Sequence, residues 1–301
     1  MPRISVVIAT YKRPEKLLRA VRTALAQTVT DLEVIVAVES NDPESVDALK
    51  AIADPRVIHV VNPAAKDGPG PARDLGARSA TGDYIAFLDD DDEWVPYKLE
   101  RQLAVAGPDI IVTALSRVVT DEGDFIRPGR PYDGAKPIDE WLFDRHSWLR
   151  GGDSMLQTSS LLIPAPLMRT LGFGNARHEE WELVIRAVKQ HGYRLVTVHE
   201  PLVIYYAGGL YPWRPSLGWV EGMRDVMTPR ALAAFCLSNA TQGLVGPERN
   251  LAFRTFFRTA FRIGKPTAKQ LFAFAMIWGV SHSLRWRLRA MLGQGAAKPG
   301  T

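Results

Sequence analysis

The chain has 301 residues, which is room for one large domain or for a medium-sized domain with a smaller one. Apolar residues make up 46% and charged residues 23%, values that are ordinary for a soluble globular protein and exclude wholesale disorder. The net charge of +4 is distributed unevenly, because residues 249–301 contain ten Lys or Arg and no Asp or Glu, which leaves the rest of the chain acidic.

A single cysteine, Cys236, excludes an internal disulfide and a cysteine zinc site, which is typical of a reducing cytoplasm. Apolar neighbours predict that it is a core residue. The apolar run at the N-terminus is too short for a signal peptide, and the longest run, residues 271–280, is about half of what spans a bilayer. We therefore expect a cytoplasmic protein without a membrane-spanning helix.

Over the first two hundred residues, short apolar runs alternate with helical stretches. The apolar runs predict strands at residues 4–9, 32–38, 57–61, 84–88, 110–113, 160–163 and 193–198. Helical spacing of apolar residues predicts helices at residues 14–27, 46–52, 69–80 and 179–191. This alternation indicates an α/β fold with a mostly parallel sheet that is covered by helices on both faces.

After Tyr206 the composition changes. Glycine, proline and aromatic residues predict a turn-rich linker at residues 207–228. Beyond it, three helices are expected at residues 229–244, 247–263 and 266–292, each opened by a proline. The chain is therefore divided into an α/β domain at residues 1–206, the linker, and a small basic helical region at residues 229–301.

Polar residues gather at the carboxyl ends of the predicted strands, where open α/β sheets bind ligands. Four consecutive aspartates, residues 89–92, directly follow the fourth strand. Adjacent like charges repel, and a turn rarely needs more than one aspartate. The run predicts a divalent metal, Mg²⁺ or Mn²⁺, that is held by one or two carboxylates and by phosphate oxygens of a substrate. A solvated turn is the alternative.

Three segments of the α/β domain form a pattern in a fixed order. In chain order they read VVIATYKRPEKL, GPGPARDLGARSATGDYIAFLDDDDEWVPYKLE and GFGNARHEEWELVIRAVKQHGYRL. Together they resemble family 2 glycosyltransferases with the GT-A fold. The resemblance runs from about residue 4 to residue 206. It implies that residues 1–206 bind a nucleotide sugar and catalyse a metal-dependent, inverting sugar transfer, with a UDP-sugar as the first choice of donor.

The resemblance also implies roles for individual residues. The nucleotide would be bound by Thr10, Tyr11, Arg13, Glu39, Arg73, Asp89 and Asp90. Tyr11 offers a ring face to the base, although an ordinary surface aromatic is the alternative. Glu39 replaces the usual aspartate of the family, and its carboxylate can accept a hydrogen bond from uracil or guanine but not from cytosine N3. The guanidinium fork of Arg73 matches phosphate or ribose oxygens, and Asp74 replaces the family's asparagine.

The resemblance also implies which residues bind the metal and which residue is the catalytic base. Asp91 is expected to bind the metal directly, and Asp92 is expected to cap the following turn. Glu180 occupies the position of the family's catalytic aspartate and would remove the proton of the acceptor hydroxyl, with Glu179 as the second choice. A solvated acidic first turn of a helix is the alternative for both glutamates. The acceptor is expected to be a glycan, a lipid-linked molecule or a small molecule.

Two other functions remain open at this level. A nucleotidyltransferase would share the open α/β architecture and a carboxylate-bound metal, and Lys12 and Arg13 are a weak match to an activating basic loop. A sugar-nucleotide-binding protein without activity is suggested by the glutamates at positions 39 and 180. Nucleic-acid binding is not expected, because the body is acidic and no known module is present.

The basic region has its own pattern. Arg254, Arg258 and Arg262 recur every four residues, phenylalanines occupy other faces, and residues 285–289 read RWRLR. Basic amphipathic helices with aromatic residues suit anionic membrane surfaces, so a peripheral membrane contact is one expectation. Helices packed on the α/β domain, with their arginines in water, are the other.

Overall fold

In the computed structural model, the described residues are 3–63, 68–121, 123–145, 154–173, 177–208, 212–241 and 248–280. The chain forms two compact units. Unit 1 comprises Met1–Asp121 and Leu156–Ala207, and unit 2 comprises Glu122–Met155 and Gly208–Thr301. The predicted boundary after residue 206 is close to the second of these divisions. The grouping of residues 122–155 with the C-terminal half is not apparent from the sequence pattern.

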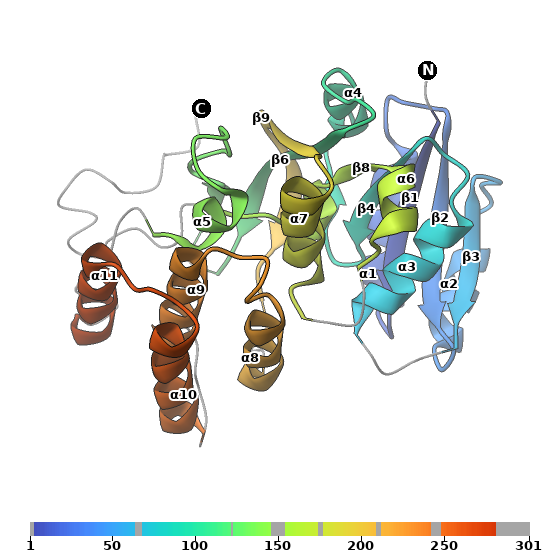
Figure 1. The fold of residues 1–301 in the computed structure, drawn as a ribbon. Helices are drawn as coiled ribbons and strands as arrows, with labels where there is room; N and C mark the ends of the chain where they lie inside the picture. The colour runs from blue at the N-terminus through green and yellow to red at the C-terminus, as the bar shows by residue number, and fades with distance from the viewer. Residues whose placement is uncertain are drawn as a thin grey trace. The chain divides into compact units, whose positions relative to one another are not determined.

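Unit 1 is built on a sheet whose strands run in the order β3-β2-β1-β4-β8-β6-β9-β5 (Figure 1). The first four strands along the chain are mutually parallel: β1 (Ile4–Thr10), β2 (Leu32–Glu39), β3 (Val57–Asn62) and β4 (Tyr84–Asp89). The others are β5 (Glu93–Trp94), β6 (Ile110–Val119), β8 (Leu162–Pro164) and β9 (Arg194–Tyr206). Strand β8 is antiparallel to β4 and β6, and β5 is antiparallel to β9, so the mostly parallel sheet ends in a mixed half.

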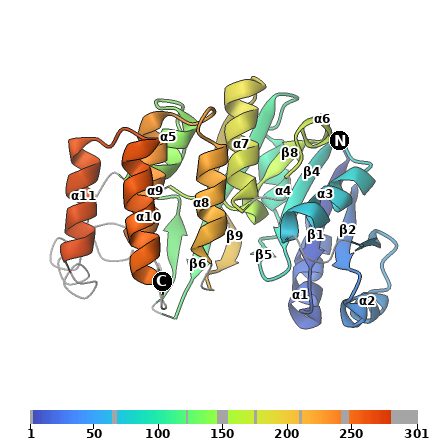
Figure 2. The same cartoon turned by 60° about the horizontal axis from the view of Figure 1, so that its bottom comes forward.

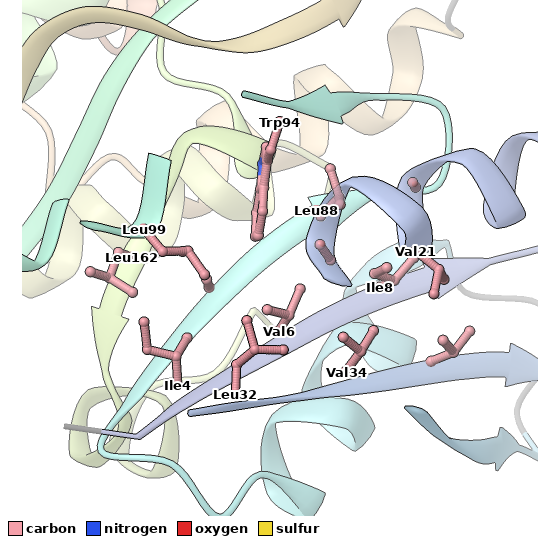
Figure 3. Packing of buried hydrophobic residues seen from close by; sticks show 14 of the residues in the cluster. Ile4, Val6, Ile8, Val21, Leu32, Val34, Leu88, Trp94, Leu99 and Leu162 are labelled. Carbon is pink, nitrogen blue, oxygen red and sulfur yellow. The ribbon is translucent and has the colours of Figure 1, made fainter. Parts of the chain in front are cut away.

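Helices flank this sheet because its central strands are apolar on both faces. Neighbouring β1 residues Val6 and Val7 point to opposite faces, and both are fully buried. On one face, side chains of β1, β2 and β4 pack with α1 (Figure 3). On the other, Gly76 of α3 lies so close that a Cβ there would meet Val7 Cγ1 at 2.5 Å. The helices of unit 1 are α1 (Pro14–Leu25), α2 (Pro43–Lys50), α3 (Pro69–Ser79), α4 (Lys98–Leu103), α6 (Ala165–Thr170) and α7 (Glu179–Gln190).

Unit 2 contains the short strand β7 (Phe125–Arg127) and helices α5 (Ile138–Phe143), α8 (Trp213–Gly222), α9 (Pro229–Thr241), α10 (Arg249–Arg262) and α11 (Ala268–Gly279). Helices α8 to α11 stand side by side in Figure 2. Their shared core is aromatic, since the ring of Phe235 contacts Phe143, Trp219 and Phe256. These helices agree with the helical region expected from the sequence. Helix α8 corrects the predicted linker at residues 207–228, because the prolines there lie at the start of a helix, where proline is well tolerated.

A buried polar network explains why residues 122–155 belong to unit 2. The Asp144 carboxylate, almost fully buried, accepts hydrogen bonds from Arg230 Nη2 at 2.6 Å and from Gln270 Nε2 at 3.1 Å. Asp139, at the start of α5, accepts one from the Thr228 backbone N–H at 2.6 Å. Such long-range polar contacts leave little trace in a local sequence pattern.

Two smaller predictions concern single features. Cys236 is buried, as expected for a small core residue. In the part of the chain that the structure describes, no helix has the length and apolarity to cross a membrane. The expected last helix, residues 266–292, is described as far as α11, and its RWRLR segment lies outside the described residues.

Candidate active site

The carboxyl ends of β1 and β4 bring the first group of predicted residues together. The two strands are in parallel register with Ala9 opposite Asp89, so the residues that follow each strand meet at one edge. Thr10 Oγ1 donates a hydrogen bond to Asp90 Oδ2 at 2.8 Å. Arg13 Nη1 donates to Asp90 Oδ1 at 3.0 Å and to Asp91 Oδ2 at 2.8 Å. Segments about 80 residues apart in the chain thus form one charged cluster.

Burial distinguishes the carboxylates of this cluster. Asp90 is 5% exposed, and this burial is the main cause that raises its pKa to about 6 despite the nearby Arg13. Asp91 has a side chain that is 30% exposed and that also faces Lys16 Nζ at 3.7 Å. Of the neighbouring aspartates 90 and 91, Asp91 is therefore the one that is more open to a ligand.

Asp92 has a different place from the one predicted. It is fully buried and accepts hydrogen bonds from Gln157 Nε2, from Ser159 Oγ at 2.6 Å and from the Tyr206 backbone N–H at 3.3 Å. The prediction that it caps the following turn is wrong, because its side chain ties the acidic run to the 3₁₀ turn Thr158–Ser160 and to the end of β9. Sequence reasoning missed these partners, and an aspartate run gives no signal that one member faces inward.

A second group surrounds Tyr11 at the end of β1. This residue is 45% exposed, its hydroxyl accepts a hydrogen bond from Asn41 Nδ2 at 3.2 Å, and Lys12 Nζ lies 5.1 Å from its ring centroid. Glu39, at the end of β2, accepts hydrogen bonds from Asn62 Nδ2 at 3.1 and 3.3 Å. A partly exposed aromatic residue and an oriented carboxylate thus follow the neighbouring parallel strands β1 and β2.

The turn between these residues is fixed by an aspartate that the sequence did not reveal as important. Asp42 Oδ2 accepts a hydrogen bond from the Lys12 backbone N–H, and the same carboxylate caps α2 by accepting from Ser45. Lys12 has a positive φ of 54°, a conformation that is unusual for a residue other than glycine. Asp42 is therefore the group that holds the chain after β1 in a strained turn beside Tyr11.

Arg73 joins the acidic run to the start of α7. It is 6% exposed, its Nη2 donates to Asp89 Oδ1 at 2.5 Å, and its Nη1 donates to Glu179 Oε1 at 2.6 Å. Burial alone would lower the pKa of Arg73, but the two carboxylates raise it above its ordinary value. With both arms of the guanidinium engaged in this way, a phosphate or ribose contact by Arg73 stays a prediction.

The two glutamates at the start of α7 differ in their surroundings. Glu179 is buried and paired with Arg73, whereas Glu180 has no ion pair with any described residue. Burial, and then the neighbouring Glu179, raise the pKa of Glu180 to about 8. A carboxylate with a raised pKa is a better proton acceptor once ionised, which is the property a general base requires.

Residues close to Glu180 in the chain make ring and hydrogen-bond contacts of their own. His178 has a positive φ of 64° and stacks on Trp181 with ring centroids 4.4 Å apart. Trp181 Nε1 donates to the Leu156 carbonyl at 3.0 Å. Before this turn, the Phe173 backbone N–H donates to Asp74 Oδ1 at 2.7 Å, so the aspartate that replaces the family's asparagine anchors the approach to α7.

Two carboxylate oxygens of the acidic run have no partner among the described residues. Asp91 Oδ1 and Asp89 Oδ2 accept no hydrogen bond from any residue that the structure describes. Among those residues no three His, Cys, Asp or Glu form a group that could hold a metal by itself. This donor set fits a hard cation that takes its remaining ligands from phosphate oxygens and water.

Comparison with known families decides the class of protein. Residues 5–159 match the family described as Glycosyl transferase family 2, and this match covers more than half of the chain. The chain belongs to glycosyl transferase family 2. The resemblance in the sequence is thereby confirmed, and the chain is a glycosyltransferase rather than a nucleotidyltransferase.

Two similar proteins are bacterial glycosyltransferases. The amylovoran biosynthesis glycosyltransferase AmsB of Erwinia amylovora is 28% identical over 251 residues, which are 75% of this chain and 79% of AmsB. WfaP of Escherichia coli is named a UDP-Glc:alpha-D-GlcNAc-diphosphoundecaprenol beta-1,3-glucosyltransferase. It is 36% identical over 103 residues, which are 34% of this chain and 41% of WfaP. The match to WfaP thus spans less than half of either protein.

A solved structure shares the fold. The mannosyltransferase PcManGT from Pyrobaculum calidifontis, in complex with GDP-Man and Mn²⁺, is 16% identical and has a TM-score of 0.55. The likeness covers 97% of this chain and 84% of that one. At this identity it shows the fold alone, and it confirms the predicted GT-A-type sheet with a helical region after it.

Proposed function

We propose that this family 2 glycosyltransferase performs an inverting, metal-dependent transfer of a sugar from a UDP-sugar to a hydroxyl group of a lipid-linked glycan. The observation that carries the proposal is the bridge made by Arg73, which holds the acidic end of β4 and the first turn of α7 within one ion-pair network. In the proposed reaction, the acidic end of β4 binds the metal and the donor's diphosphate. A glutamate in the first turn of α7 removes the proton of the acceptor hydroxyl.

In this proposal the nucleotide lies over the carboxyl ends of β1 and β2. Tyr11 offers its exposed ring to the base, and Glu39, oriented by Asn62, accepts the N3–H of uracil. Thr10 and Arg13 hold Asp90 in place for the ribose, and Arg13 and Arg73 supply positive charge toward the diphosphate. The UDP in the name of WfaP supports this choice of base, while the GDP-Man of PcManGT keeps guanine as the main competitor.

Asp91, together with the unpartnered oxygen of Asp89, would hold Mn²⁺ or Mg²⁺. When bound, the ion neutralises charge on the departing diphosphate. The Mn²⁺ in the PcManGT structure supports a metal in this fold. Arg13 and Lys16 lie on the other oxygen of Asp91, so they keep the carboxylate in place without occupying the whole group.

Glu180 would act as the general base. Its carboxylate accepts the proton of the acceptor hydroxyl while the hydroxyl oxygen forms a bond to the anomeric carbon and the bond from that carbon to the diphosphate breaks. Attack from the face opposite the leaving group inverts the anomeric configuration. Glu179 is held by Arg73 and therefore has a positioning role in this scheme.

A lipid-linked acceptor is supported by the diphosphoundecaprenol in the name of WfaP. A soluble glycan and a small-molecule alcohol are the other acceptor classes, and the transfer chemistry at Glu180 would be the same for each. The acceptor must present a hydroxyl close to the first turn of α7.

The full chain should be incubated with UDP-, GDP- and dTDP-sugars, with and without Mn²⁺, and free nucleotide measured over time. We expect release of UDP from a UDP-sugar, an increase with Mn²⁺, and faster release when a diphosphate-linked lipid sugar is added. The anomeric configuration of the product is read by nuclear magnetic resonance. Binding of a UDP-sugar without any turnover would support a binding protein instead, and preference for a GDP-sugar would overturn the assignment of the base.

A further inference from the structure

The outward sides of α10 and α11 combine positive charge with exposed apolar side chains. Six cations lie on these helices and on the turn between them: Arg249, Arg254, Arg258, Arg262, Lys265 and Lys269. There is no Asp or Glu from residue 249 onward to balance them. Among the described residues only Arg262 has an acidic partner, Glu221. Apart from Arg262, these cations of unit 2 therefore form no ion pair with a described acidic residue.

Helix α10 presents a mixed face to solvent. Its buried side consists of Ala252, Phe256, Thr259 and Ala260. The side opposite carries Leu251 and Phe261, which are 50% and 51% exposed, together with the exposed Arg254 and Arg258. At 100° per residue these positions fall within one half of the helix circumference, so cations and apolar groups share a single face.

Helix α11 continues this surface with apolar groups. Its buried side is Gln270, Ala273 and Ile277. Phe272 and Trp278 are 57% and 48% exposed on the other side, and Lys269 is the one charged residue of the helix. Outward-facing Phe and Trp on a helix without a polar face are costly in water, since each exposes a large apolar area.

Ring contacts join the two helices into one surface. Phe253 of α10 lies 6.0 Å from Phe274 and 4.3 Å from Trp278 of α11, between ring centroids. The Arg249 guanidinium lies 5.7 Å from the Trp278 ring centroid. We call the exposed residues Leu251, Arg254, Arg258, Phe261, Phe272 and Trp278 the α10–α11 face.

We propose that the α10–α11 face docks unit 2 on the surface of an anionic lipid bilayer. The arginines match the negative headgroups, and Phe272 and Trp278 enter the boundary between headgroups and acyl chains, where aromatic side chains are favoured. A nucleic acid would satisfy the arginines but would leave Leu251 and Phe272 without an apolar environment. The bilayer is the occupant that matches both properties of the face.

The test is flotation of the full chain with phosphatidylcholine vesicles and with vesicles of an equimolar mixture of phosphatidylcholine and phosphatidylglycerol. We expect binding to the mixed vesicles at low salt, weak binding to pure phosphatidylcholine, and a decline as salt rises, because the charge contribution is screened. Failure to bind mixed vesicles at low ionic strength would overturn the proposal.

Two variants separate charge from insertion. Arg254→Glu with Arg258→Glu should weaken binding to mixed vesicles at least about twentyfold, since each juxtamembrane cation contributes roughly fivefold. Leu251→Ser with Phe272→Ser should weaken it while leaving the salt dependence intact. The matched control is Lys50→Glu with Arg169→Glu, which makes the same charge change at exposed positions of unit 1 and should bind like the parent chain.

Circular dichroism and UDP-sugar hydrolysis establish that each variant is folded, and neither readout depends on the proposed docking. Equal loss in the control variant would show a general charge effect and overturn the proposal. A dimer of the parent chain in light scattering that Leu251→Ser with Phe272→Ser dissociates would assign the face to a second copy. Release from vesicles by duplex DNA at low stoichiometry, with tight DNA binding, would assign it to nucleic acid.

Discussion

The acidic edge of the sheet in unit 1 and the α10–α11 face of unit 2 differ in whether their arginines form ion pairs. In unit 1, Arg13 and Arg73 are each bound to two carboxylates of the site. In unit 2, Arg254 and Arg258 are exposed and have no acidic partner among the described residues. The same residue type is an internal counterion in one region and an unpaired surface charge in the other.

The difference between paired and unpaired arginines has different consequences for ligand binding in the two regions. Repulsion between adjacent carboxylates is reduced by cations fixed in the fold, so the acidic run is ordered before any ligand arrives. An unpaired cationic surface has long-range attraction for an external anion, at the cost of strong sensitivity to salt. In the two proposals, the fixed ion pairs of unit 1 prepare a catalytic site, and the unpaired arginines of unit 2 bind an external anionic surface.

The largest effect is expected at Glu180, which forms no ion pair with a described residue although its neighbour Glu179 is paired with Arg73. Glu180→Gln keeps the size of the side chain but cannot accept a proton, so turnover should fall by roughly two to four orders of magnitude. Calorimetry should find the affinity for UDP nearly unchanged. Glu179→Gln should cost less, because Glu179 positions Arg73. If Glu179→Gln abolishes turnover and Glu180→Gln does not, the base is the neighbouring glutamate.

The same substitution in both regions tests the comparison directly. Arg73→Met leaves Asp89 and the buried Glu179 without their cation, and removal of one partner from a buried pair costs about 3–5 kcal/mol of unfolding free energy. Arg254→Met should change it by no more than about 0.5 kcal/mol, as is usual for an exposed position. Urea unfolding measures both free energies, and similar shifts for the two variants would contradict a difference between buried and exposed arginines.

A third prediction concerns the more open carboxylate of the acidic run. Asp91→Asn should weaken UDP binding in the presence of Mn²⁺ roughly tenfold to a hundredfold, the size expected when one charged contact is lost. The Mn²⁺ dependence should disappear with it. Asp47→Asn, at an exposed position of α2, provides the neutral control. If Asp91→Asn still binds UDP in a metal-dependent way, the metal ligand must be another residue.

The smallest effect is a difference in pH dependence between catalysis in unit 1 and vesicle binding by unit 2. Burial and Glu179 raise the pKa of Glu180 to about 8, so the carboxyl group is mostly protonated at pH 6 and ionises as the pH rises. The value of kcat/KM should therefore increase about tenfold per pH unit below pH 7 and level off above pH 8. Arginines remain charged throughout this range, so vesicle binding should stay constant. A flat kcat/KM profile would contradict the role of Glu180.

Much of unit 1 could be predicted from the sequence because its signals are local. The buried strands β1, β2 and β4 are continuous apolar runs, and the prolines at the starts of α1 and α3 mark helix starts. Where a strand is irregular, the strand predicted from the local pattern is too short. Strand β9 continues to Tyr206, whereas the predicted strand ends at residue 198, because Pro201 and a register shift interrupt the pattern.

In the candidate site, the sequence likewise predicted features that depend on local patterns but not the contacts between distant residues. Its residues were predicted by their position after strands and by the resemblance to family 2, and their roles stay predictions. The pairing of Arg73 with Asp89 and Glu179 joins positions 16 and 106 residues apart, and nothing near Arg73 in the sequence identifies these partners. The inward orientation of Asp92 has the same character, since its partners lie 65 or more residues away.

By itself the sequence determined the strand–helix alternation, the family, the acidic run and the uneven charge, because each is written in neighbouring residues. Only the tertiary structure decided which carboxylates are neutralised, which glutamate is left without a cation, and that residues 122–155 pack with the C-terminal helices through Asp139 and Asp144. Ion pairs and burial depend on how distant segments meet, and this is set by strand order and packing rather than by any local pattern.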